Sequence, residues 1–358
     1  MSFINSTLWN DLQVSDATNE KRFPPLGVVD AVADSTPAVD YVPPSAVQAF
    51  REASSLRNVE IPVIKDQSVT VVQTPGFNFI PDNLPETDKY SFTAYDVFSG
   101  FRHTKSAYAN NMVDEKFAVE QVMRNVAHKM GQEIESILST VLESRKTQAL
   151  NHTTQVSQGD GTFTFNATPD VLEVSKAAQK ETMFYNLQAL MSANDLDGMY
   201  RLISSRAGMA AQIAESLKYG ANNDKNIQNL GFLPLDRIHE TDAVSAGSDI
   251  FNGYFLRDGS IGMFENFPYD FRNGSEVGGK KWGISDVEIP FTRLRANIYT
   301  NSEATEATSL ITSGTDSNLK MTHFEEMAIW TRFYVVYRYN SAIATRPNDI
   351  IKISGKTS

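Results

Sequence analysis

The sequence contains no cysteine and no long apolar run. Its 358 residues can therefore form no disulfide, no thiolate zinc site and no cysteine nucleophile. A membrane-spanning helix needs roughly 20 consecutive apolar residues, and no such stretch is present. The first residues, MSFINSTLWNDLQ, also lack the basic start and apolar run of a signal peptide. We therefore expect no contact with a membrane and a protein used inside the cell that makes it.

Positive charge is scarce. The chain has 32 Lys and Arg against 43 Asp and Glu, a net charge of -11. Such a chain gains nothing from the general phosphate attraction behind nonspecific nucleic-acid binding, and Lys280-Lys281-Trp282 is weak evidence for a nucleic-acid site. Hydrophobic residues at 41% and charged residues at 21% are typical of a globular protein. The length suggests two or three domains.

No convergent catalytic or metal-binding motif is present in the sequence. None of the five histidines forms an H-E-x-x-H pair, and no G-x-S-x-G turn occurs. Gly355-Lys356-Thr357 lacks the upstream glycine of a phosphate-binding loop. We interpret the remaining polar groups as surface or loop residues and expect no enzyme activity, no cofactor and no metal. These groups are His323 with Glu326 (on a strand, so pointing apart), His239-Glu240-Thr241-Asp242, and Asp195 with Asp197.

The clearest element is an amphipathic helix over residues 114–148. Apolar residues recur there at steps of three and four, and charged residues fill the remaining positions. The helix would be on the order of 50 Å long, and Gly131 is its one weak position. The apolar set is Phe117, Val122, Met123, Val126, Met130, Ile134, Ile137, Leu138, Val141 and Leu142.

Residues 58–82 alternate between apolar and polar positions, which predicts a long two-stranded ribbon. Lys65-Asp66-Gln67-Ser68 offers the turn between its strands. A lone hairpin is marginal in water, so we expect this ribbon to lie on another surface. A further strand is predicted over 90–102.

Residues 1–56 are punctuated by prolines and keep no long apolar period, yet they are too apolar for a free tail. We expect an arm that lies on something else. The alternative is an ordinary extended N-terminus on its own domain.

The remainder predicts helices and strands in alternation. Helices are expected over 168–192 and 205–218, and strands over 199–204, 254–256, 261–264, 291–299, 327–339 and 350–353. In the long strand over 327–339, one face carries Met327, Ile329 and Phe333 and the other carries Trp330 and Arg332.

In this order, the elements resemble a tailed-phage major capsid protein of the Hong Kong 97 fold. The resemblance covers most of the chain. Its motifs are His103–Tyr108 with Asp114–Val119, Asn125–Glu135, Met199–Ser205 and Arg346–Ile351.

The resemblance implies an α+β, Hong Kong 97-type capsid fold with an N-terminal arm, an extended β-hairpin loop, a peripheral domain with a long spine helix, and an axial domain. The expected boundaries are 1–56 for the arm, 57–94 for the extended loop, 95–165 for the peripheral domain with spine helix 114–148, 166–290 for the axial domain, and 291–358 for the return to the peripheral domain in long β-strands.

The implied function is self-assembly, as hexamers and pentamers, into the icosahedral shell that encloses the double-stranded DNA of a tailed bacteriophage. Scaffolding, portal and decoration proteins would be further partners, and the acidic charge would leave packaged DNA in loose contact only. The shell would assemble in the host cytoplasm and remain in the virion. Some relatives crosslink a loop lysine, for which Lys65 is the candidate, but no matching asparagine context is present and no crosslink is predicted.

Apolar burial between subunits would drive this association. The residues expected to make inter-subunit contacts are Val59, Ile61, Val63, Lys65, Val69, Val71, Phe77, Phe79, Phe3, Trp9 and Phe23.

Two other functions stay open at this point. An encapsulin-like nanocompartment shell would share the fold and enclose protein cargo, and neighbouring genes would separate the two. A soluble acidic enzyme acting through carboxylates such as Asp195 and Asp197 would be a stable monomer with a pocket.

Overall fold

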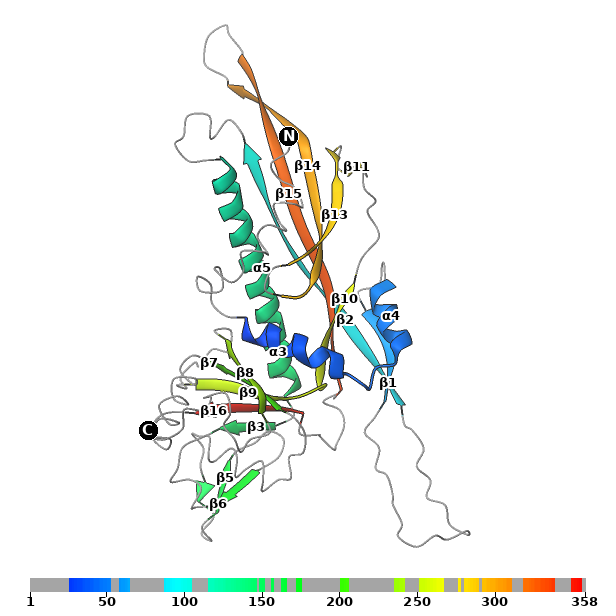
Figure 1. Ribbon diagram of the computed structural model, residues 1–358, viewed down its shortest axis with the longest axis vertical. Coiled ribbons are helices and arrows are strands. Elements are labelled where there is room, and N and C mark those ends of the chain that lie inside the picture. The colour runs from blue at the N-terminus through cyan, green and yellow to red at the C-terminus, as the bar shows by residue number, and fades with distance from the viewer. Residues whose placement is uncertain are drawn as a thin grey trace.

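A computed structural model describes the chain in segments. They are residues 26–52, 58–64, 87–104, 115–146, 148–151, 156–157, 162–165, 172–175, 200–205, 235–241, 251–266, 276–277, 280–289, 292–310, 318–338 and 349–355. These segments form a mixed helix and sheet structure, in which one long helix runs beside a sheet of long strands and a smaller sheet lies at one end (Figure 1).

The main sheet is antiparallel and is built from unusually long strands. Its order is β1-β2-β15-β14-β13, and β10 pairs with the end of β15. At about 3.3 Å per residue, the 18 residues of β2 and the 20 of β15 extend for roughly 60 Å. The bounds are β1 Asn58–Ile64, β2 Thr87–Thr104, β10 Ile261–Asn266, β13 Gly283–Glu288, β14 Arg295–Leu310 and β15 Asn318–Tyr337.

The smaller sheet has the order β3-β16-β9-β7-β8, and two short antiparallel sheets accompany it. The strand β7 is buried along its whole length, as expected for a central strand covered on both faces. The bounds are β3 Gln148–Asn151, β7 Tyr200–Ser205, β8 Leu235–Thr241, β9 Phe251–Arg257 and β16 Ile350–Gly355, with β4 Val156–Ser157, β5 Thr162–Phe165 and β6 Leu172–Ser175 in one short sheet and β11 Glu276–Val277 and β12 Lys280–Lys281 in the other.

The turn between β9 and β10 carries the chain from the smaller sheet to the main sheet. Gly259 occupies this turn with a φ of 75°, and a Cβ there would lie 2.4 Å from the carbonyl oxygen of Ala38. Glycine is therefore required by both the backbone conformation and the close approach. The two strands flanking the turn were expected from sequence, and the structure assigns them to different sheets.

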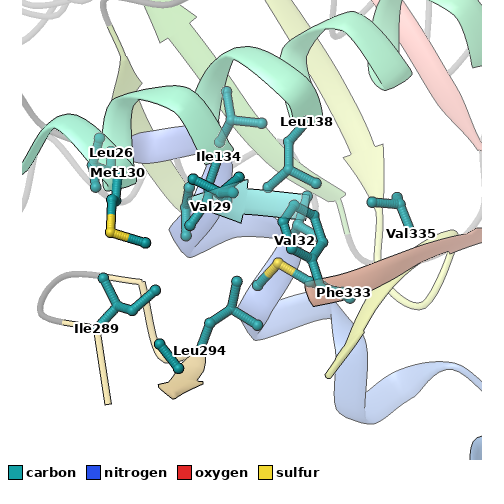
Figure 2. Close-up of a cluster of buried hydrophobic side chains, with 14 of the residues drawn as sticks. Leu26, Val29, Val32, Met130, Ile134, Leu138, Ile289, Leu294, Phe333 and Val335 are labelled. Atoms are coloured by element: carbon teal, nitrogen blue, oxygen red, sulfur yellow. The ribbon is translucent and has the colours of Figure 1, made fainter. Parts of the chain in front are cut away.

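The long helix α5, Glu115–Arg145, confirms the helix expected over 114–148. Its apolar stripe faces the main sheet, and Ile134 and Leu138 are fully buried there with Phe333 of β15 (Figure 2). This packing accounts for the glycine at position 131, because a Cβ there would lie 2.6 Å from a methyl carbon of Leu26. The helix thus gives up some intrinsic stability, about 1 kcal/mol, to let the N-terminal segment approach closely.

Residues 26–52, which we call the strap, pack against their own chain. The strap contains α3, Gly27–Ser35, a short 3-10 turn η1, Thr36–Ala38, and α4, Pro44–Glu52. Val28, Val29 and Val32 are fully buried in the same cluster as α5, and Figure 1 shows α3 crossing between the long helix and the smaller sheet. The expectation of an arm that lies on something else is therefore wrong for residues 26–52, because their apolar side chains fill the subunit's own core. Residues 1–25 lie outside the described residues.

A second hydrophobic cluster lies where α4 covers one end of the main sheet. Phe50 of α4 is fully buried and its ring stacks on Phe264 of β10, with centroids 5.8 Å apart. Phe92 of β2 and Tyr334 of β15 pack against Phe50 with centroids at 5.9 and 4.9 Å. The covered face of the sheet at this end is thus opposite to the face that α5 covers farther along the strands.

Several strands expected from sequence are confirmed, and the long strand over 327–339 pairs with the stretch 291–299 as expected, but some strands lie in another sheet than expected. β2, β7, β9, β10, β15 and β16 occupy the predicted stretches, and β14 pairs with β15. The last strand β16 was expected among the peripheral strands but pairs with β9 and β3 in the smaller sheet. Conversely, β10 and β13 come from the stretch 166–290, which was expected as the axial domain, and lie in the main sheet. The chain therefore crosses between the sheets more often than the expected boundaries imply.

Two local predictions are wrong. The helix expected over 168–192 is a strand at Leu172–Ser175, where β6 pairs with β5 and where alternating Leu172, Glu173 and Val174 suit a strand equally well. The ribbon expected within 58–82 instead pairs β1 with the start of β2, so that Ile64 lies opposite Thr87. The rest of 168–192 and the helix expected over 205–218, apart from Ser205 at the end of β7, lie outside the described residues.

Replacing Ile134 by aspartate should lower the free energy of unfolding by about 3–5 kcal/mol, because it places a charge in the apolar interface between α5 and the sheet. Urea denaturation followed by circular dichroism measures the effect. Ser136→Asp, on the exposed side of the same helix, is the matched control and should change the unfolding midpoint little. An Ile134→Asp variant that unfolds like the unmodified chain would show that this face is not buried.

Candidate assembly surface

The structure buries the first of the expected contact residues inside their own subunit. Ile61 and Val63 of β1 are 2% and 1% exposed and belong to the cluster around Phe50. Val59 is partly buried against the same cluster. The expectation that Ile61 and Val63 contact a neighbouring subunit is therefore corrected, since α4 and β2 of the same chain already cover them.

The other expected contact residues lie outside the described residues, and their contacts stay a prediction. They are Lys65, Val69, Val71, Phe77, Phe79, Phe3, Trp9 and Phe23. The stretch 65–86 lies outside the described residues and connects the paired ends of β1 and β2, which we call the stem.

A row of side chains on the main sheet is left uncovered by the described elements. In β2 the side chains of Val97 and His103 are buried, whereas Phe98 between them is 68% exposed. Side chains alternate across a strand, so the exposed set faces away from α5. On β15 the residue directly opposite Phe98 is Trp330. Phe98 and Trp330 are therefore an aromatic cross-strand pair on the face away from α5. We call the four residues Phe98, Gly100, Ala328 and Trp330 the outer row.

An ion pair borders the outer row on one side. Arg332 lies opposite Asp96 and donates to both of its carboxylate oxygens, with distances of 2.6 Å from Nε and 3.2 Å from a terminal nitrogen. The indole Nε1 of Trp330 also donates to Asp96, at 3.1 Å, and the guanidinium of Arg332 lies 4.9 Å from the centre of the indole ring. One carboxylate thus fixes the orientation of the arginine and the tryptophan together.

A second ion pair borders the row on the other side. Arg102 of β2 lies opposite Glu326 of β15, and a guanidinium nitrogen approaches the carboxylate to 2.8 Å. An apolar centre between fixed charges of both signs is the composition typical of protein–protein contact surfaces, where aromatic anchors lie inside a polar rim. The outer row is therefore the best-defined candidate contact surface among the described residues.

Other exposed apolar side chains occur near the start of the long helix and at the stem. Phe117 is 56% exposed and Val122 is 38% exposed on α5, and Ile64 at the end of β1 is 39% exposed. Single exposed apolar residues are ordinary on protein surfaces. They add candidate contacts but do not form a bordered patch like the outer row.

The polar residues that the sequence offered as possible sites lie in strands of the sheets, as far as the structure describes them. His239 and Thr241 lie in β8 and are 4% and 0% exposed, so the expectation of a solvated loop is wrong: β8 pairs in parallel with β7 and contacts α3. His323 and Glu326 both lie in β15, the strand in which they were expected. Asp195 and Asp197 lie outside the described residues.

Within the segments that the structure describes, no three His, Asp or Glu side chains gather as metal ligands would. No helix in those segments is both long and apolar enough to cross a bilayer.

Sequence reasoning missed the outer row because its alternation is ambiguous. The strand over 90–102 was expected, but both faces of β2 carry aromatic residues, Phe98 on one and Phe101 on the other. The covered face also changes along the strand, since α4 covers Phe92 and α5 covers Val97. In β15 the separation of Trp330 and Arg332 from the apolar face was the one available signal.

Replacing Asp96 by alanine should lower the free energy of unfolding by about 1–3 kcal/mol, because Arg332 and the indole nitrogen of Trp330 both lose their acceptor. Urea denaturation measures this loss. Glu60→Ala removes an exposed carboxylate from β1 and should change stability by less than about 0.5 kcal/mol. Equal effects of the two substitutions would contradict a structural role for Asp96.

Comparisons with known proteins give matches to solved structures alone. No protein-family model matches the sequence, and no curated protein matches it. One solved structure, "Mycobacterium phage Che8", has a TM-score of 0.44 and 10% identity, and covers 88% of this chain and 89% of its own. A second, "Capsid structure of the Cyanophage P-SCSP1u", has a TM-score of 0.44, 11% identity and 86% coverage of each chain. A third, "Asymmetric unit of bacteriophage PhiM1 mature capsid", has a TM-score of 0.40 and 9% identity, with 85% and 83% coverage.

Proposed function

We propose that this chain is the major capsid protein of a tailed bacteriophage and that copies of it assemble, as hexamers and pentamers, into the icosahedral shell around the double-stranded DNA genome. The shell protein would be assembled in the host cytoplasm and would remain in the virion. Scaffolding, portal and decoration proteins would be its further partners.

The observation that carries the proposal is the outer row. Phe98 is 68% exposed, although it sits in the middle of a long strand and Val97 beside it is 5% exposed. Leaving the Phe98 ring in water forfeits roughly 1.5–3 kcal/mol that burial would supply. A second copy lying on this face would recover that energy, and the bordering ion pairs would fix its register.

The layout of the described elements supports the same proposal. A 31-residue helix packs along a sheet that contains strands of 16 to 20 residues. The strand β16, near the C-terminus, belongs to the smaller sheet, where it pairs with β9. The stem formed by β1 and β2 lies where the resemblance to Hong Kong 97-type capsid proteins implies an extended loop. We extend that proposal to residues 65–86, which would reach a neighbouring subunit from this stem.

The charge of the chain suits a shell around DNA. A net charge of -11 repels the phosphate backbone, so packaged DNA would touch the inner wall only loosely. Assembly would then depend on apolar contacts between subunits.

Replacing Phe98 by aspartate should stop assembly without unfolding the subunit. Because Phe98 is largely exposed, the thermal midpoint should stay within a few degrees, whereas a charge in the proposed contact should prevent closed particles. Light scattering after size exclusion, with negative-stain electron microscopy, measures the outcome.

Thr93→Asp is the matched control, since Thr93 is exposed on the same strand near the stem, and it should assemble like the unmodified chain. Normal particles from Phe98→Asp would remove the outer row as the contact surface. A purified unmodified chain that stays monomeric under all assembly conditions would argue against a shell protein and for the soluble enzyme.

A further inference from the structure

A buried carboxylate joins the strap to the long helix. Glu135 lies in the C-terminal half of α5 and is 2% exposed. Its two carboxylate oxygens accept the backbone N–H groups of Val28 and Val29, at 3.0 and 2.8 Å. The hydroxyl of Thr241 in β8 donates to the same carboxylate. Three elements far apart in the sequence therefore meet at one side chain.

The carboxylate takes the place of a missing helix cap. The N-cap position of α3 is Leu26, whose side chain has no acceptor, and no side-chain cap bond forms within the strap. The first N–H groups of a helix need acceptors, and here Glu135 supplies them from another helix. The packing around this point is tight, since a Cβ on Gly27 would lie 2.1 Å from the carbonyl oxygen of Glu240.

The N-terminus of α3 compensates an ionised carboxylate at Glu135 only in part. Among the described residues no lysine, arginine or histidine forms an ion pair with it, and Asp30 in the first turn of α3 opposes its charge. One turn away on α5 itself lie only groups that do not titrate. The other titratable groups on the two elements that donate to Glu135 are Asp34 on α3 and Asp236, Arg237, His239 and Glu240 on β8.

Burial raises the pKa of Glu135 to about 7, although the hydrogen bonds from Thr241, Val28 and Val29 act in the opposite direction. The neutral carboxyl suits the same geometry. Its carbonyl oxygen still accepts an N–H group of α3, and its proton can lie toward the hydroxyl oxygen of Thr241. Ionisation keeps the acceptors but places in the core a charge that no cationic side chain among the described residues pairs with.

We propose that Glu135 is a proton-dependent latch for the strap: its neutral form holds α3 against α5 and β8, and its ionisation loosens this attachment. The carboxyl binds its proton more tightly in the attached state than in water, where its pKa is about 4.5. The attachment is therefore strongest below pH 4.5, weakens as the pH rises from about 4.5 to 7, and changes little above that range.

Hydrogen–deuterium exchange of the full-length chain at pH 6 and pH 8.5, corrected for intrinsic exchange rates, tests this latch. The opening of α3 amides should increase about tenfold between the two pH values. Amides of the buried part of α5 around Leu138 should show no such increase and serve as the internal reference.

The variant Glu135→Gln cannot ionise and should abolish the pH dependence of α3 opening. Glu133→Gln, which removes an exposed carboxylate two residues away on the same helix, should behave like the unmodified chain. A tenfold increase that persists in Glu135→Gln, or an unmodified chain without any increase, would overturn the proposal.

If Glu135→Gln fails to fold, Asp30→Asn decides the question. Removing the opposing charge should make ionisation of Glu135 less costly and should reduce the increase in α3 opening, whereas an unchanged increase would contradict the latch. None of these measurements requires assembly, so failure of the latch and failure of the proposed shell function give different results.

Discussion

The fold depends on covering one long helix from two sides. A 31-residue amphipathic helix cannot bury its apolar stripe against a sheet alone, because the side of α5 that Leu26 covers at Gly131 would stay in water. The strap supplies the second cover with three fully buried valines, each worth roughly 1.5–3 kcal/mol. Gly131 permits the approach of Leu26, and the carboxylate of Glu135 satisfies the N–H groups that the strap helix brings with it. Apolar burial and polar satisfaction therefore coincide at one turn of the helix.

The same strap joins the two sheets through a group of charges. Arg201 of β7 is 7% exposed and pairs with Asp34 of α3 at 3.5 Å and with Asp258 in the β9–β10 turn at 3.0 Å. Asp34 also binds Arg293 in the connection between β13 and β14; although burial alone would raise the pKa of Asp34, these arginines and His239 lower it. A buried charge that lost its partners would destabilise the subunit by about 3–5 kcal/mol. Because all four groups come from different elements, the pairs fix the smaller sheet relative to the main sheet.

The sequence predicts the elements of this protein better than their partners. Periodicity identified α5 within a few residues and located the long strands, because each of them is long enough to show its repeat. It did not find their full extent, since β14 runs on to Leu310 and β15 begins at Asn318. It could not show that β1 pairs with β2, since Val69 and Val71 continue the same alternation. It also could not show that Leu26, Val28 and Val29 fill the subunit's own core, because an apolar segment between prolines suits a neighbour's surface equally well. Glu135 is a charged residue within an amphipathic helix, and only the arrival of α3 from more than 100 positions away makes it a cap.

The burial of the strap and of the stem residues within their own chain limits which parts of its surface are available for association. The strap and the stem residues Ile61 and Val63 are satisfied within one chain, so neither requires a neighbour in order to fold. The outer row differs, because Phe98 is exposed while the residues that flank it are held by ion pairs and cannot turn inward to cover it. A subunit built in this way can fold before it assembles and still present a rigid apolar contact. Rigid contacts lose little side-chain entropy on association, which favours assembly in a single register over loose aggregation.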